Sequence, residues 1–232
     1  MGLGRDFLDD LIELKTTGAL DSAKRVVEIG AQQLDDYLIL SPRLAELWQL
    51  FGTKEPPHFM PVGLECFTER APLAAPVWYA LGFEHQSIDI KGGTIRLDLN
   101  HGRVPWSLRG SYDLLVNGGT TEHIANQGNA FRAMHDLMRV GGVMYHEVPS
   151  IGWLDHGLIS YQPKFFHRLA RENDYEMIFF KVAPERAWRE PEYFRQYNEP
   201  YGLPIPKAGP SIELRIAFRK RFNSAFVMPV DG

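Results

Sequence analysis

Several features that mark other classes of protein are scarce or missing in this chain of 232 residues. Its single cysteine, Cys66, cannot form an internal disulfide or a multi-cysteine zinc site, so we expect a packed or idle thiol in a reducing compartment. No run of about 18 consecutive apolar residues is present. The first residues include acids where a signal peptide needs an apolar stretch. We therefore expect a soluble, cytoplasmic protein without a membrane partner.

Two further absences narrow the function. The formal net charge is -4 and the pI is about 6.1, so there is no basic surface of the kind that nucleic-acid binding requires. The G-x-G-x-x-G pattern of dinucleotide-binding loops is missing, which argues against a nicotinamide-dependent oxidoreductase. A small molecule is then the better expected partner. The composition itself, 44% hydrophobic and 23% charged, is that of an ordinary globular protein.

What the chain does contain is an alternation of short apolar runs with segments of helical periodicity. This alternation predicts a three-layer, doubly wound α/β fold with a mostly parallel sheet of about seven strands. The expected strands are 24–31, 85–93, 94–100, 112–119, 143–149, 175–182 and 212–219, and the expected helices are 5–18, 33–50 with an interruption near Pro42, 126–139 and 163–172. In the last strand apolar and mostly polar residues alternate from Ile212 to Arg219, which predicts a half-buried, antiparallel closing strand near a sheet edge.

Two proline-rich segments, 52–77 and 184–210, interrupt this pattern. We interpret both as inserts in a single domain spanning 1–232, and we expect the first to wrap on its surface. Substrate selectivity is expected there, because loops vary while the strand scaffold is shared. The second insert mixes cations with aromatics, which suits an anionic or sugar-like substrate or, equally, a homodimer contact. The residues in question are Arg186, Trp188, Arg189, Tyr193, Arg195 and Tyr197.

Polar residues follow each predicted parallel strand, where ligands bind in sheets of this kind. Gly30 ends the first strand and lets a ligand approach backbone amides. Asp89 ends the second and can accept the hydroxyls of a ribose. Asp98 can accept from an adenine amino group while Leu99 covers the ring, although Asp98 also suits a simple turn. The full set of candidate cofactor-binding residues is Glu28, Gly30, Ala31, Gln32, Asp89, Asp98, Leu99, Asn117 and Gly118.

This series of strand ends resembles the class I S-adenosylmethionine (SAM)-dependent methyltransferases. VVEIGA (26–31), SIDI (87–90), LDLN (97–100), YDLLVNGGTTEH (112–123) and HDLMRVGGVMYHEVP (135–149) are similar to successive motifs of that family. The resemblance covers about 24–183 and 212–219, and it implies SAM as the cofactor and a small-molecule acceptor. Ala31 and Gln32 depart from it, because the family's first loop usually has two or three glycines. The acceptor and the methylated atom stay open.

Methyl transfer is an in-line displacement that depends mostly on positioning, and a general base can assist it. Four of the 8 histidines lie between positions 123 and 156. The candidate catalytic residues, all from this region or directly before it, are His123, His156, Glu122 and His146. We expect His135 to face solvent or its helix neighbours.

Other interpretations of these residues stay open. Glu122 and His123 can simply cap the helix that follows, with Thr120 or Thr121 as N-cap. His146 suits a buried, hydrogen-bonded group. His146, Glu147 and His156 suggest a metal site, but they lack a compact ligand spacing and we expect no metal. The altered first loop also suits a non-catalytic relative that binds a nucleoside or a protein partner.

Overall fold

The computed structural model describes residues 2–60, 71–153, 156–184 and 211–231, and it contains a seven-stranded mixed sheet. The strand order is β5-β4-β2-β6-β7-β9-β8. Among these strands, β9 is antiparallel to both of its neighbours, β7 and β8, and the other neighbouring pairs are parallel. The strands are β2 (Arg25–Ile29), β4 (Glu84–Asp89), β5 (Ile95–Arg96), β6 (Tyr112–Gly118), β7 (Met138–Pro149), β8 (Tyr175–Pro184) and β9 (Ile212–Lys220).

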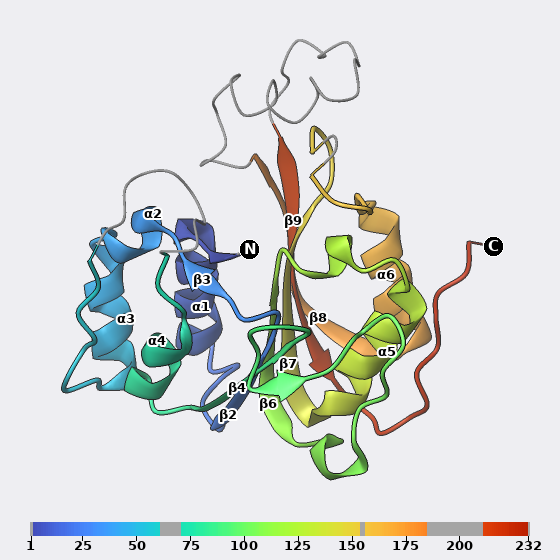
Figure 1. Ribbon diagram of the computed structural model, residues 1–232, viewed down its shortest axis with the longest axis horizontal. Helices are drawn as coiled ribbons and strands as arrows, with labels where there is room; N and C mark the ends of the chain where they lie inside the picture. Colours follow the sequence, from blue (N-terminus) through green and yellow to red (C-terminus); the bar gives the residue numbers. More distant parts are fainter. Residues whose placement is uncertain (1, 61–70, 154–155, 185–210, 232) are drawn as a thin grey trace.

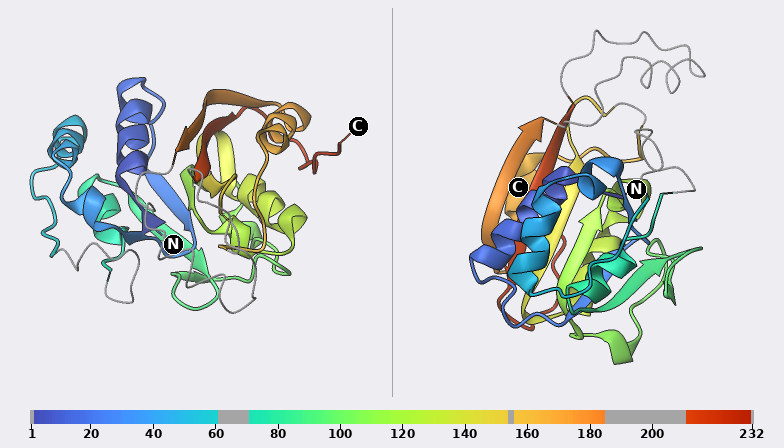
Figure 2. Two further views of the ribbon diagram at one scale, coloured as in Figure 1. Left: turned by 90° about the horizontal axis from the view of Figure 1, so that it is seen from above. Right: turned by 90° about the vertical axis from the view of Figure 1, so that its left-hand side faces the viewer.

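Helices cover both faces of this sheet (Figures 1 and 2). One layer contains α1 (Arg5–Thr16), α2 (Asp36–Ile39), α3 (Arg43–Phe51) and α4 (Ala75–Ala80), and the other contains α5 (Gln127–Leu137) and α6 (Pro163–Glu172). Each layer encloses a hydrophobic core of its own, because alternate strand residues such as Val26 and Val27 point to opposite faces. The predicted three-layer, doubly wound sheet with an antiparallel closing strand is therefore confirmed.

The register of the parallel strands aligns their carboxyl ends. Ile29 of β2 pairs with Ile88 of β4, and Asn117 of β6 pairs with His146 of β7. The residues that follow these strands consequently meet at one edge of the sheet. A short parallel pair, β1 (Gly2–Leu3) with β3 (Gln33–Leu34), lies at the same edge, since a Cβ on Gly118 would meet Leu3.

The closing strand differs from the sequence prediction in one respect. β9 lies between β7 and the edge strand β8, near an edge as predicted, but both of its faces are buried. The prediction of a half-buried strand is wrong because the polar residues of its alternation are not exposed: Glu213 and Arg215 are only 6% and 7% exposed. Arg215 pairs with Asp6 and Asp10 of α1, and Glu213 lies 3.4 Å from the Arg215 guanidinium, so protein charges replace the water that the prediction assumed.

A network of buried charges joins α1 to the far end of the chain. Arg215 donates to the carboxylate of Asp10 at 3.1 Å and to the backbone oxygen of Asp6 at 3.1 Å. Lys181 of β8 donates to the other oxygen of Asp10 at 2.6 Å, and the Tyr145 hydroxyl donates to Asp10 at 3.0 Å. Asp10 is completely buried, so this network neutralises a charge that the core would otherwise reject.

Two other local expectations need correction. Residues 71–77, the end of the first proline-rich segment, are not a surface wrapping: Ala74 and Val77 are buried, and α4 begins at Ala75. His135 does not face solvent, since it is 2% exposed and bonds the Tyr175 hydroxyl at 2.6 Å and the Ser224 backbone oxygen at 2.8 Å. Cys66 and the mixed cationic and aromatic residues of 184–210 lie outside the described residues. Within the described part, no helix is long and apolar enough to cross a membrane.

Candidate active site

The first strand-end loop turns sharply at Gly30. Its φ of +79° lies in the left-handed region that favours glycine, and a Cβ there would come 2.5 Å from the Thr120 hydroxyl oxygen. The Gly30 amide donates to the Ile88 carbonyl at 2.8 Å, which ties this loop to β4. Glycine is thus required by both the backbone conformation and the lack of space.

Asp89 lies directly beside this loop. One carboxylate oxygen accepts from the Ala31 amide at 3.1 Å, and the other accepts from the Lys91 amide at 2.9 Å. Partial burial opposes ionisation of Asp89, but the backbone amides of Lys91, Ala31, Gly92 and Ile90 outweigh it and lower its pKa. The side chain stays partly exposed, so an ionised carboxylate is available to a ligand in contact with the Gly30–Ala31 backbone.

Glu28 and Gln32 build the loop from below. Glu28 is 1% exposed and accepts from Trp78 Nε1 at 2.6 Å and from the Gln32 amide at 3.2 Å, and His85 Nε2 lies 3.0 Å from its Oε2. Gln32, also 1% exposed, donates to the Ile29 carbonyl at 2.6 Å and to the Thr120 hydroxyl at 3.0 Å. These contacts stabilise the loop conformation that several glycines provide in the resembled family.

The third strand end places its two candidates differently. Asp98 is exposed and accepts a hydrogen bond from the Asn100 amide at 2.8 Å, so it forms a turn, which is the alternative to an adenine contact. Leu99 is 5% exposed and belongs to the hydrophobic core beneath α5. Only Asp98 therefore presents its side chain at the surface of this edge.

Asn117 and Gly118 end β6 and are both buried. The Asn117 amide donates to the Thr121 hydroxyl at 2.9 Å, and its carbonyl accepts from the Thr121 backbone amide at 3.2 Å. A Cβ on Gly118 would come 2.9 Å from Leu3 and 3.2 Å from the Gln32 side-chain oxygen. Asn117 thus positions the following turn, η2 (Thr121–His123), and Gly118 permits close packing at the strand end.

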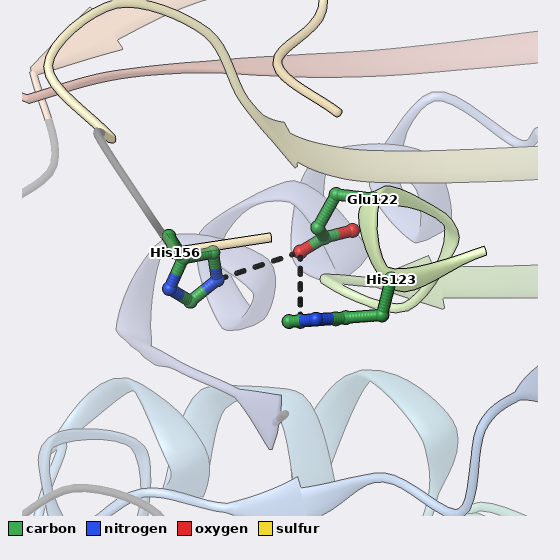
Figure 3. A group of neighbouring side chains, drawn as sticks. All are labelled: Glu122, His123 and His156. Carbon is green, nitrogen blue, oxygen red and sulfur yellow. Dashed lines mark ion pairs between the residues drawn. The ribbon is translucent and has the colours of Figure 1, made fainter. Parts of the chain in front are cut away.

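Three of the four candidate catalytic residues meet at this turn (Figure 3). Oε1 of Glu122 lies 3.9 Å from His123 Nε2 and 3.6 Å from His156 Nε2, and the two imidazole centroids are 5.3 Å apart. The Glu122 side chain is fully buried, while the His123 and His156 side chains are 38% and 20% exposed. Partial burial lowers the pKa of His123, against the opposing effect of Glu122.

The loop after β7 holds His156 in this group. The amides of Leu158 and Ile159 both donate to the Glu122 carbonyl, at 2.8 and 3.0 Å. The Trp153 ring packs edge-on against His156 with centroids 4.8 Å apart, and its Nε1 donates to the Ile212 carbonyl at 3.0 Å. Sequence reasoning named His156 but missed these supports, because no local pattern links Glu122 to a loop more than 30 residues later.

His146 does not join the other three. It is 1% exposed and packs among the rings of Phe131, Phe166 and Phe218, where burial lowers its pKa to about 3. Its Nδ1 lies 3.3 Å from the Asn117 amide nitrogen.

Glu147 points to the opposite face of the sheet, where its Oε2 lies 2.9 Å from the Tyr145 hydroxyl oxygen. Burial, and the nearby Glu213, raise its pKa. The set His146, Glu147 and His156 is consequently not assembled.

No family model and no curated protein matches this sequence. Solved structures match across most of the chain at low identity. The [4+2]-cyclase SpnF is 12% identical with a TM-score of 0.50, covering 92% of this chain and 80% of its own. A putative sarcosine dimethylglycine methyltransferase from Galdieria sulphuraria is 12% identical with a TM-score of 0.49, covering 95% and 92%. A SAM-dependent methyltransferase from Archaeoglobus fulgidus is 12% identical with a TM-score of 0.46, covering 91% and 94%.

Strand order and strand direction identify the architecture independently of these scores. The first three parallel strands run outward from the sheet centre, the next two run the other way, and the antiparallel β9 lies between β7 and β8. The chain therefore has the fold of the class I SAM-dependent methyltransferases.

Proposed function

We propose that this protein is a SAM-dependent methyltransferase that acts on a small-molecule acceptor. The observation that supports it is that two groups of residues lie at the same edge of the sheet, at the carboxyl ends of the parallel strands. The first part of this edge contains the loop at Gly30 and the carboxylate of Asp89. The second part contains Glu122, His123 and His156. This edge combines a place for a nucleoside with titratable groups for an acceptor. The fold alone does not select the reaction, since a [4+2]-cyclase shares it.

The residues at the first part fit SAM. The surroundings of Gly30 have no space for a side chain, so this position offers a ligand only backbone atoms. Asp89 offers an ionised carboxylate that can accept hydrogen bonds from both ribose hydroxyls. Asp98 would accept a hydrogen bond from the adenine amino group. At Gly118 the absence of a side chain lets the end of β6 pack closely against Leu3. When bound, SAM would supply an activated methyl group on a positively charged sulfur.

At the second part, His123 or His156 would accept a proton from the acceptor. The lone pair of an acceptor oxygen or nitrogen forms the new bond to the methyl carbon, the electrons of the breaking bond go to sulfur, and the proton goes to an imidazole Nε2. The buried carboxylate of Glu122, 3.6 Å from His156, would stabilise the imidazolium that forms. Both imidazoles are partly exposed and therefore reachable by a small acceptor.

Calorimetric titration of the full chain with SAM and with S-adenosylhomocysteine tests the proposal. Asp89→Asn should weaken binding about 10- to 100-fold, since a hydrogen bond to a charged group contributes about 1.5–3 kcal/mol. The matched control is Glu84→Gln, an exposed acid at the opposite end of the same strand, which should leave affinity unchanged. Absence of both binding heat and thermal stabilisation would refute the proposal.

A second candidate is a non-catalytic protein that binds a nucleoside, and the filled first loop favours it. Gln32 occupies this loop with a buried side chain instead of leaving open backbone. Titration with adenosine separates the two functions: adenosine binding without binding of SAM or S-adenosylhomocysteine would favour this candidate.

A further inference from the structure

We infer that Glu122, His123 and His156 form a binding site for a divalent transition-metal ion such as Zn²⁺. Among the described residues, their ligand atoms form a group that lies within 4.8 Å of one another. One carboxylate with two imidazoles is a ligand set that zinc and iron sites use. The inference rests on these three side chains and does not require that the protein transfer methyl groups.

The distances are close to those of a loaded site. Zinc bonds of about 2.1 Å in a tetrahedron place neighbouring ligand atoms about 3.4 Å apart. Oε1 of Glu122 is 3.6 Å from His156 Nε2 and 3.9 Å from His123 Nε2. Small rotations of the two imidazoles would bring all three atoms to one ion, and Figure 3 shows both rings beside the same carboxylate oxygen.

The state of Glu122 is the second observation that points to a cation. Its side chain is fully buried, and neither carboxylate oxygen makes a hydrogen bond within the described part of the chain. A buried carboxylate without hydrogen bonds costs several kcal/mol unless a positive charge is near. Two imidazoles whose nitrogens are 3.6 and 3.9 Å away stop short of hydrogen-bond contact, and a metal ion between them would supply that charge.

The backbone around the group is fixed before any ion binds. Thr121 is held by two hydrogen bonds to Asn117, and the carbonyl of Glu122 accepts two amides from the loop that contains His156. Gly157 packs directly on Glu122, since a Cβ there would lie 3.0 Å from the Glu122 Cγ and backbone oxygen. Such preorganisation reduces the ordering cost of metal binding.

Three protein ligands leave at least one coordination position open, which is typical of catalytic rather than structural zinc sites. The two imidazoles are partly exposed, so water or an acceptor oxygen can reach that position. If the proposed function also holds, a metal here would bind the acceptor and acidify its hydroxyl, in place of proton acceptance by an imidazole.

Titration of chelator-treated full chain with Zn²⁺, followed by calorimetry, tests the inference, with Co²⁺ absorption as a second readout. One equivalent should bind, and the Co²⁺ bands should indicate nitrogen and oxygen ligands. His156→Ala and Glu122→Gln should each weaken Zn²⁺ at least about 10-fold. His101→Ala, which removes an exposed histidine elsewhere on the same sheet edge, should leave the affinity unchanged. Circular dichroism checks that each variant is folded.

Two outcomes would overturn the inference: no saturable binding of Zn²⁺ or Co²⁺ by the parent chain, or equal affinity in the parent, His156→Ala and His123→Ala proteins. SAM titration on the metal-free chain keeps the two proposals apart. If the chain binds Zn²⁺ but not SAM, the metal site is supported and methyl transfer is refuted. If it binds SAM but not Zn²⁺, the metal site is refuted and the proposed function is not.

Discussion

Two buried glutamates stand at the same edge of the sheet, each with histidine beside it, yet their surroundings are opposite. Glu28 accepts hydrogen bonds from Trp78 and from the Gln32 amide, and His85 lies 3.0 Å away. Glu122 is equally buried, but its two histidines lie 3.6 and 3.9 Å away and, within the described residues, its oxygens accept no hydrogen bond. The two carboxylates therefore differ: both Glu28 oxygens accept a hydrogen bond from a described residue, and neither Glu122 oxygen does.

This difference teaches that burial and a neighbouring histidine do not by themselves indicate a functional carboxylate. The hydrogen bonds of Glu28 support the loop at Gly30. Glu122 accepts no hydrogen bond from the part of the chain that the structure describes, and such destabilised groups are common at functional sites. The comparison therefore predicts that the two residues differ in their effect on stability and on ligand binding.

The largest effect should separate the two glutamates in stability. Glu28→Gln places an amide NH₂ against either Trp78 Nε1 or the Gln32 amide, because both Glu28 oxygens are acceptors, and should cost about 2–3 kcal/mol of unfolding free energy. Glu122→Gln loses no hydrogen bond to a described residue and should change stability by less than about 1 kcal/mol, or increase it. Urea unfolding measures both, and equal losses would break the comparison.

A smaller effect should follow from Gly157, which packs against Glu122. Gly157→Ala places a Cβ 3.0 Å from the Glu122 Cγ and carbonyl oxygen, so the loop must move and should lose about 1–2 kcal/mol of unfolding free energy. Zn²⁺ affinity should fall as well, because His156 moves with this loop. The control is Gly128→Ala in α5, where the nearest atom is 3.8 Å away and helix propensity should increase stability by about 0.5–1 kcal/mol. Unchanged stability and Zn²⁺ affinity in Gly157→Ala would contradict the proposed support.

The smallest effect concerns His146, a buried histidine whose pKa is lowered by burial. Its folded pKa of about 3 lies below the unfolded value near 6.5, so the unfolded chain binds the extra proton and stability falls as pH drops through 6.5. Between pH 7 and 5.5 this histidine should account for about 1 kcal/mol of lost stability. In His146→Phe the pH dependence of urea unfolding should shrink by that amount. An unchanged pH dependence would show that the pKa of His146 is not lowered in the folded state.

Most of the fold was predictable because hydrophobic periodicity is a local property. The helix expected over 163–172 matches α6, and the strand expected over 112–119 matches β6 within one residue. The surroundings of β9 were not predictable, since alternating charges indicate an exposed face unless a partner such as Asp10 lies far away in sequence. The strand predicted over 94–100 is too long, since β5 contains only Ile95 and Arg96. The chain leaves the sheet after Arg96 and forms the turn at Asp98.

The candidate site divides in the same way. Parallel strands alone place Asp89 near Gly30, and in the structure the amide of Ala31, the residue after Gly30, donates to the Asp89 carboxylate at 3.1 Å. The opposite directions of His146 and Glu147 follow from strand alternation, a signal already present in the sequence. The meeting of Glu122 with His156 depends on backbone hydrogen bonds from Leu158 and Ile159, which no sequence pattern reveals.

The ion pair between Arg215 and Asp10 spans 205 positions and joins an early helix to the closing strand. At a synthesis rate of about 5–20 residues per second, Arg215 is added to the chain roughly 10–40 seconds after Asp10. Lys181, 171 positions after Asp10, arrives only slightly sooner. On the ribosome the Asp10 carboxylate therefore lacks both of these cations until the last two strands of the sheet have been made.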